Sequence, residues 1–69
     1  MTVTERRHLC INGHRTTIAM EAIFWRGAEL EAMRRDLTWQ DWIAFQVDNK
    51  PAQTERTSWL RQRIYLAKY

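Results

Sequence analysis

The dipeptide Asn12-Gly13 lies between two stretches in which apolar and polar residues alternate. Asn-Gly is typical of a two-residue hairpin turn, because both central residues of a type I′ turn have positive φ. Such a turn would pair Ile11 with His14 and Leu9 with Thr16. One face of the hairpin would then be apolar and face the core. The opposite face would carry six residues: Arg6, His8, Cys10, Arg15, Thr17 and Ala19. The alternative is that residues 8–11 stay unpaired.

After Glu21 the period of the apolar residues changes from two to about 3.6, which predicts a helix. Its apolar stripe consists of Phe24, Trp25, Ala28, Ala32 and Met33. Gly27 weakens this helix unless its missing side chain lets another backbone approach closely.

The segment Thr38-Trp39-Gln40-Asp41 matches the capping pattern that begins a second helix. Asn49-Lys50-Pro51 ends that helix, because proline cannot donate the helical hydrogen bond. A third helix is predicted over about 54–67, with packing positions at Trp59, Leu60 and Ile64 and at Tyr65 or Leu66. The four tryptophans follow helical stripes, so we interpret them as packing residues of the core and of a dimer interface rather than as a base-stacking surface.

A chain of 69 residues has room for one domain, and a core of that size gives marginal stability. Cys10 is the only cysteine, which excludes a disulfide within the chain and a cysteine-only zinc site. A two-stranded ribbon is not stable by itself in water. We therefore expect self-association, in which identical strands pair around a twofold axis in a homodimer.

The charge is unevenly distributed along the chain, which carries 11 Lys and Arg against 8 Asp and Glu. Residues 36–49 contain three acids and no cation, whereas residues 50–69 contain five cations and one acid. The net charge of +3 favours an anionic partner such as nucleic acid, although a basic helix face exposed to solvent would also account for the tail. With no apolar secretion or membrane segment and one free thiol, the cytoplasm is the expected location.

No residue pattern indicates catalysis. There is no glycine-rich phosphate loop, and the acids Glu29, Glu31, Asp36 and Asp41 are predicted on helix surfaces and ends, where solvation and capping account for them. His8, Cys10 and His14 offer three possible metal ligands, but their spacing fits no zinc finger and a fourth ligand is missing. The prediction is a protein that is not an enzyme and holds no metal or cofactor.

The run from Gly13 to Glu21 (GHRTTIAME), followed by Phe24-Trp25, resembles the ribbon-helix-helix proteins. It is most similar to a bacterial subgroup with a Gly-His-Arg-Thr-Ser-like strand and a Phe-Trp pair opening the first helix. Leu37-Thr38 resembles the turn before the family's second helix, and residues 58–61 (SWLR) are similar to a closing Ser-Ala-Leu-Arg segment. Asp36 stands where the family usually has glycine in this turn.

The resemblance implies a mostly α fold with a short N-terminal β element. It implies a ribbon-helix-helix domain over residues 8–69, with an additional C-terminal helix and an N-terminal arm at residues 1–7. Two chains would form an intertwined homodimer that shares an antiparallel β-ribbon.

In this family the ribbon enters the DNA major groove. By position, the resemblance implies that Arg15, Thr17 and Ala19 read bases. It also implies phosphate contacts by the start of the second helix (Thr38, Trp39 and Gln40) and by Arg6 and Arg7. The implied function is a sequence-specific transcriptional regulator, a repressor of a bacterium, phage or plasmid, which binds double-stranded DNA at the nucleoid. The alternative is a protein-binding module on the same dimer scaffold, such as an antitoxin or a host-factor inhibitor.

Overall fold

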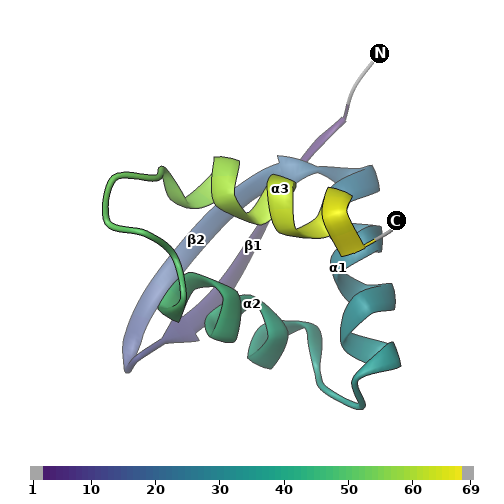
Figure 1. Cartoon of the computed structure of the whole chain (residues 1–69), viewed down its shortest axis with the longest axis horizontal. Coiled ribbons are helices and arrows are strands. Elements are labelled where there is room, and N and C mark those ends of the chain that lie inside the picture. The colour runs from purple at the N-terminus through teal and green to yellow at the C-terminus, as the bar shows by residue number, and fades with distance from the viewer. Residues whose placement is uncertain (1–2, 68–69) are drawn as a thin grey trace.

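The computed structural model describes residues 3–67, which form a β-hairpin followed by three helices. The three helices lie together on one side of the hairpin (Figure 1). The predicted order of hairpin and helices is thus confirmed. The elements are β1 (Thr4–Ile11), β2 (His14–Glu21), α1 (Ala22–Arg34), α2 (Trp39–Asp48) and α3 (Arg56–Ala67).

The hairpin has the register predicted from its turn, with Ile11 opposite His14 and Leu9 opposite Thr16. Asn12 (φ 52°) and Gly13 (φ 81°) both have positive φ, as a type I′ turn requires. Because β1 begins at Thr4, residues 4–7 belong to the sheet rather than to a separate N-terminal arm.

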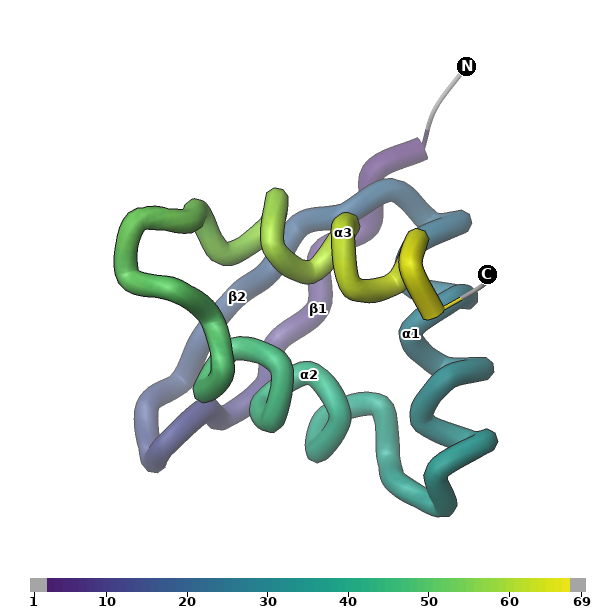
Figure 2. Tube along the Cα trace, in the orientation of Figure 1, coloured from purple at the N-terminus to yellow at the C-terminus, as the bar shows by residue number. Residues whose placement is uncertain are grey.

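Both strands of this ribbon come from one chain and run side by side (Figure 2), whereas the family resemblance implies a ribbon made by two chains. The tip of the hairpin is also attached to the helical layer. Asn12 at the tip donates a hydrogen bond of 2.7 Å from Nδ2 to Oδ1 of Asp48, the last residue of α2.

The core lies between the hairpin and the helices, and every element contributes to it. Its buried apolar residues are Leu9, Ile11, Ile18, Met20, Trp25, Ala28, Ala32, Trp42, Ile43, Leu60 and Ile64. At the crossing of α1 and α3, a Cβ added to Gly27 would lie 2.6 Å from Cγ2 of Ile64. The missing side chain of Gly27 therefore does allow a close approach, although by a side chain rather than by a backbone.

Two of the predicted packing sites in the helices are wrong. Met33 is 73% exposed, and Tyr65 and Leu66 are each 60% exposed. In α3 the buried face is set by Leu60 and Ile64, four residues apart, and the next two positions rotate away from it. The tryptophans divide in the same way, because Trp25 and Trp42 are buried while Trp39 and Trp59 are half-buried at the edge of the core.

The predicted position of Glu31 on the helix surface is wrong, because its side chain is buried. Its carboxylate accepts hydrogen bonds from Nη1 of Arg34 at 3.2 Å and from Nε of Arg35 at 2.8 Å. Pairing of both carboxylate oxygens offsets part of the cost of removing the charge from water. Glu31 thus forms ion pairs with two arginines at the C-terminal end of α1.

The turn between α1 and α2 places Asp36 in the left-handed region, with φ of 60°. The amide of Leu37 donates to the carbonyl of Ala32 at 2.9 Å, which satisfies one of the last carbonyls of α1. Glycine is common at such a position because it has no Cβ. Asp36, at the position where the resemblance implies glycine, thus adopts the backbone conformation that glycine most easily supplies.

Candidate nucleic-acid interface

The outward face of the hairpin is the side that no helix covers. Arg15 and Thr17 of β2 are exposed there, and Ala19 is half-buried. In the strand register Arg15 faces Cys10, Thr17 faces His8, and Ala19 faces Arg6. The three residues expected to read bases therefore share one face with the outward residues of β1.

The Arg15 side chain forms no ion pair or hydrogen bond with any residue in the described range 3–67. Thr17, by contrast, has a hydrogen-bond partner on the other strand. Its Oγ1 lies 2.8 Å from Nδ1 of His8. His8 is exposed on the same face. Sequence reasoning placed His8 outward but missed its link to Thr17, which the pairing of positions 8 and 17 in the predicted register could have indicated.

Arg6 and Arg7 lie on opposite faces of β1. Arg6 is exposed on the outward face. The guanidinium of Arg7 instead lies on the helical side, 4.8 Å from the ring centre of Trp25 and 5.0 Å from that of Trp39. The alternation of side chains along a strand makes this separation unavoidable. The structure therefore does not bring Arg7 together with Arg6 and Arg15.

Two acids hold Arg7 in this position. Glu5 forms an ion pair with its Nε, and Glu29 of α1 accepts from its Nη1 at 2.9 Å. Burial would lower the pKa of Arg7, but hydrogen bonds and charge from Glu5 and Glu29 outweigh it, so its pKa is raised. Arg7 is thus a fixed positive charge behind the sheet.

The start of α2 lies beside β1 on the helical side of the sheet. Thr38 is its N-cap, and its Oγ1 accepts from the amide of Asp41 at 3.1 Å, as the capping pattern predicts. Trp39 packs edge-on against Trp25 with ring centres 5.5 Å apart. No residue in the described part of the chain accepts from the amides of Trp39 or Gln40. A helix start with free amides is suited to binding an anion.

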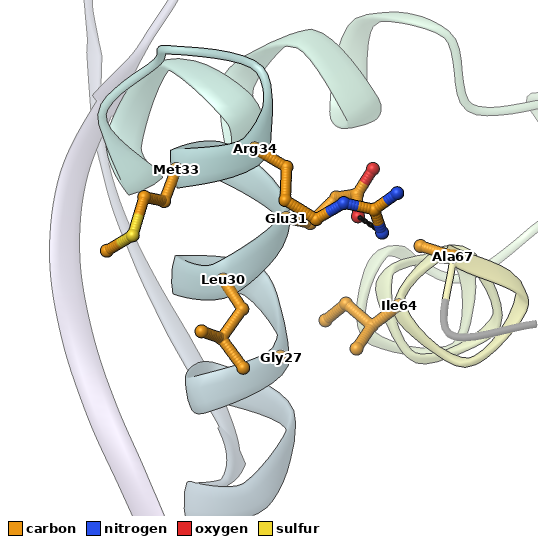
Figure 3. A pocket seen from close by; sticks show the side chains of 7 residues that line it. All are labelled: Gly27, Leu30, Glu31, Met33, Arg34, Ile64 and Ala67. Atoms are coloured by element: carbon orange, nitrogen blue, oxygen red, sulfur yellow. Dashed lines mark hydrogen bonds and ion pairs between the residues drawn. The ribbon is translucent and has the colours of Figure 1, made fainter.

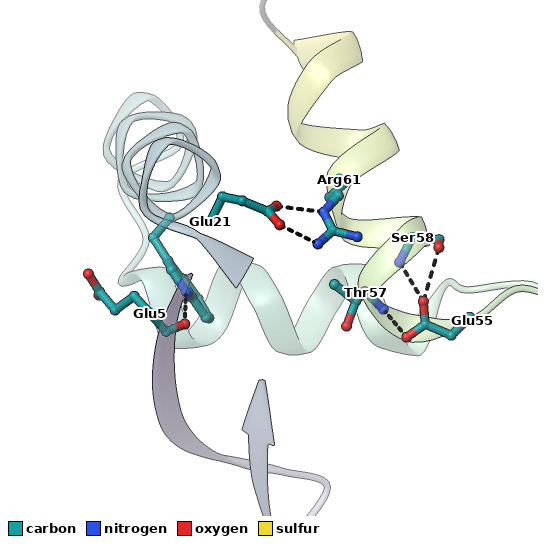
Figure 4. A network of polar contacts seen from close by, with 7 residues as sticks. Glu5, Glu21, Glu55, Thr57, Ser58 and Arg61 are labelled. Atoms are coloured by element: carbon teal, nitrogen blue, oxygen red, sulfur yellow. Dashed lines mark hydrogen bonds and ion pairs between the residues drawn. The ribbon is translucent and has the colours of Figure 1, made fainter. Parts of the chain in front are cut away.

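An ion pair between Glu21 and Arg61 holds α3 against the end of the hairpin (Figure 4). Arg61 donates from Nε and Nη2 to the two carboxylate oxygens of Glu21, at 2.8 and 2.7 Å. The hydrogen bonds from Arg61 lower the pKa of Glu21. Because Glu21 is the last residue of β2, this pair links the strand that carries Arg15 to the C-terminal helix.

Glu55 precedes α3 and accepts from the amides of Ser58 and Thr57, at 2.9 and 3.0 Å. These backbone hydrogen bonds, together with the Ser58 hydroxyl, lower the pKa of Glu55 to about 2. The helix begins at Arg56, about two residues after the predicted start at about 54, and Glu55 caps it.

Metal clusters and membrane-spanning helices are both absent from residues 3–67. No three His, Cys, Asp or Glu side chains gather there as a metal site would need. No helix in that range has the length and apolar character needed to cross a membrane.

Neither a curated protein nor a solved structure matches this chain. The family model described as the ribbon-helix-helix domain matches residues 4–68, which includes the hairpin and all three helices. The match spans nearly the whole chain and agrees with the observed order of elements. The chain belongs to the ribbon-helix-helix domain family.

Proposed function

We propose that this chain is a sequence-specific DNA-binding regulator, not an enzyme, which represses transcription by placing its hairpin in the major groove of an operator. The observation that carries the proposal is the outward face of the hairpin. It is exposed, no helix covers it, and its Arg15 has no partner among the described residues. The major groove has a width that admits a β-ribbon. Such a repressor would act in the cytoplasm, on the DNA of a bacterium, phage or plasmid.

Each outward residue of β2 has a role that its chemistry supports. Arg15 donates a bidentate pair to O6 and N7 of guanine, which discriminates between bases by about 1–3 kcal/mol. The hydroxyl of Thr17 bonds a base edge while His8 orients it. Ala19 offers only an apolar contact, for example with the methyl group of thymine.

Phosphate contacts come from both sides of the sheet. Arg6 contacts the backbone from the outward face, and the free amides at the start of α2 (Trp39 and Gln40, next to the Thr38 cap) bind a second phosphate. Arg7 contributes through its charge rather than through a phosphate contact. It adds positive potential from behind the sheet, because Glu5 and Glu29 already occupy its guanidinium.

The proposed active unit is a homodimer, in which β2 of one chain pairs with β2 of the other. The outer edge of β2 has no partner strand among the described residues. It runs for eight residues without proline or lysine, which are the residues that usually protect an edge. The edge of β1 is less suited to self-pairing, because Glu5, Arg6 and Arg7 follow each other there.

Pairing along β2 gives a four-stranded sheet with the two β2 strands at its centre. The outermost strands are then about 14 Å apart, slightly more than the roughly 12 Å width of the major groove. The β2 strands therefore enter the groove, and the β1 strands lie over its rims. This arrangement assigns base reading to Arg15 and Thr17 and phosphate contact to Arg6.

The test is binding of the purified chain to the DNA upstream of its own gene, measured by fluorescence anisotropy against a scrambled duplex. Arg15→Ala should abolish the preference for the specific duplex and leave the helical circular dichroism unchanged. Arg56→Ala removes one charge from an exposed position of α3 and serves as the control. Equal affinity of Arg15→Ala and wild type for the specific duplex would show that this face does not read DNA.

A second candidate is the protein-binding module, which an exposed apolar stripe on α1 favours. Ile23, Leu30 and Met33 are all more than half exposed. Salt separates the two functions, because DNA binding should weaken by orders of magnitude between about 50 and 200 mM salt, whereas an apolar protein interface should hardly respond.

A further inference from the structure

The three helices border an open cavity of about 210 Å³ that no strand residue lines. Arg35 borders it from the end of α1, Trp42 and Gln46 from α2, and Arg63 from α3. It is therefore separate from the outward face of the hairpin. Its polar lining does not serve any role in the proposed DNA binding.

Two arginines are held at this cavity through only one nitrogen each. Arg35 donates from Nε to Oε1 of Glu31 at 2.8 Å. Arg63 donates from Nε to Oε1 of Gln46 at 3.2 Å, and its guanidinium lies 5.5 Å from the ring centre of Trp59. Within residues 3–67, no acceptor bonds the terminal nitrogens of either arginine. The guanidinium groups are thus positioned but have donors to spare.

The cavity is also bordered by the buried side chain of Trp42. Trp42 is 2% exposed, and its indole Nε1 is the only buried side-chain nitrogen or oxygen in the described residues that lacks a hydrogen bond. Because this nitrogen has almost no exposed surface, a ligand in the cavity would contact the indole ring rather than the nitrogen, and the indole signal serves as a reporter of binding.

The balance of charge around the cavity is positive. The single acid in its lining is Glu31, and both oxygens of that carboxylate already accept from Arg34 and Arg35. Among residues 3–67 no acid forms an ion pair with Arg63. Guanidinium groups with free terminal nitrogens bind carboxylates and phosphates in bidentate geometry.

An apolar groove of about 280 Å³ adjoins this cavity and shares Glu31 and Ala67 with it. Figure 3 shows Gly27 and Leu30 on α1, with Ile64 and Ala67 on α3 beside them. An anion that carries a short hydrocarbon chain would place the chain here. The polar cavity alone has room for about seven non-hydrogen atoms, taking about 30 Å³ for each water-sized group.

We propose that this cavity binds a small organic anion, whose carboxylate or phosphate group is held between Arg35 and Arg63. The site lies on the helical side of the molecule, so its occupation does not depend on DNA binding. Butyrate represents the carboxylate form, and inorganic phosphate represents the phosphate form.

The experiment is a ¹H–¹⁵N correlation NMR titration of the wild-type chain with sodium butyrate and, separately, with sodium phosphate, at constant ionic strength kept with sodium chloride. The Trp42 indole signal is assigned by its loss in Trp42→Phe. Saturable shifts of this signal and of the Gln46 and Arg63 amides are expected with at least one of the two anions. Which of them binds decides between the carboxylate and the phosphate.

Arg63→Gln should weaken this binding about tenfold, since a charge-assisted bidentate contact is lost. It leaves the Glu31 pairs intact, and dispersion of its NMR spectrum verifies that it folds. Arg56→Gln removes the same charge from the same helix, away from the cavity, and should bind as the wild type does. The proposal is overturned if neither anion gives saturable shifts, or if both variants lose the same affinity.

Discussion

Gly27 of α1 and Ile64 of α3 lie so close that a Cβ on the glycine would come within 2.6 Å of the Cγ2 methyl group of the isoleucine. The two helices can pack at this distance only because position 27 has no side chain. Gly27 interrupts an otherwise good helix-forming stretch, where glycine costs about 1 kcal/mol relative to alanine. The close packing of the helices compensates for that cost.

Gly27→Ala is therefore expected to lower the free energy of unfolding by about 1 kcal/mol, because overpacking outweighs the gain in helix propensity. Urea denaturation followed by circular dichroism measures the change. In an Ile64→Ala background the clash is gone, and the same substitution should then stabilise the protein. A loss of equal size in both backgrounds would mean that the methyl group of Ile64 is not the obstacle.

Replacement of Asp36 by glycine should stabilise the folded protein. The φ of 60° at Asp36 is unfavourable for a residue with a Cβ, so Asp36→Gly is expected to raise the free energy of unfolding by about 0.5 kcal/mol. Asp36→Asn removes the charge at the end of α1 but keeps the side chain. If asparagine stabilises as much as glycine does, the charge rather than the backbone conformation is responsible.

Ionised Glu55 should stabilise the protein, and this contribution should be lost in acid. Its pKa is lowered from 4.5 to about 2 by the amides of Ser58 and Thr57, so the ionised form stabilises the folded state. This stabilisation is complete above the ordinary pKa and is lost as the pH falls towards about 2. The melting temperature should fall over this range, and it should fall less in Glu55→Gln. Parallel curves for the two proteins would contradict the capping role of Glu55.

Arg6 and Arg7 should behave differently although they are neighbours in sequence. Arg6→Ala should reduce the slope of log affinity for DNA against log salt by about 1, because one phosphate contact is lost. Arg7→Ala should leave that slope unchanged and instead lower the stability by about 1–2 kcal/mol, through loss of its contacts with Trp25 and Trp39. Salt-dependent anisotropy and urea denaturation distinguish the two effects. A reduced slope in Arg7→Ala would show that its guanidinium reaches the DNA.

The hairpin and its register could be predicted from the sequence because they follow from local rules. Asn12-Gly13 fixes the turn, and strict alternation then places each side chain on one face. The start of α2 is equally local, since Thr38 caps the helix within its own first turn. The outward positions of Arg15 and Thr17 follow from the same alternation.

The packing of the helices could not be predicted in the same way, because it depends on which helix covers which face. Spacing alone assigns Met33 to the apolar stripe of α1, yet α3 crosses α1 at Gly27 and leaves Met33 in solvent. The pairs of Glu31 with Arg34 and Arg35 follow helical spacing, but the burial of Glu31 depends on how the other helices pack on α1, which no local pattern fixes. The position of Arg7 is a further case, since its neighbours Trp25 and Trp39 come from two other elements.

The hydrogen bond between Asn12 and Asp48 affects how the hairpin can bind a partner. It anchors the tip of the two strands to the last residue of α2, so the tip is not free to swing as the end of a long β-hairpin usually is. The tip is therefore held in one position before any encounter, and less conformational entropy is lost there on contact. Whatever meets this hairpin must conform to its shape, and a flexible duplex step would bend to it more readily than a stiff one.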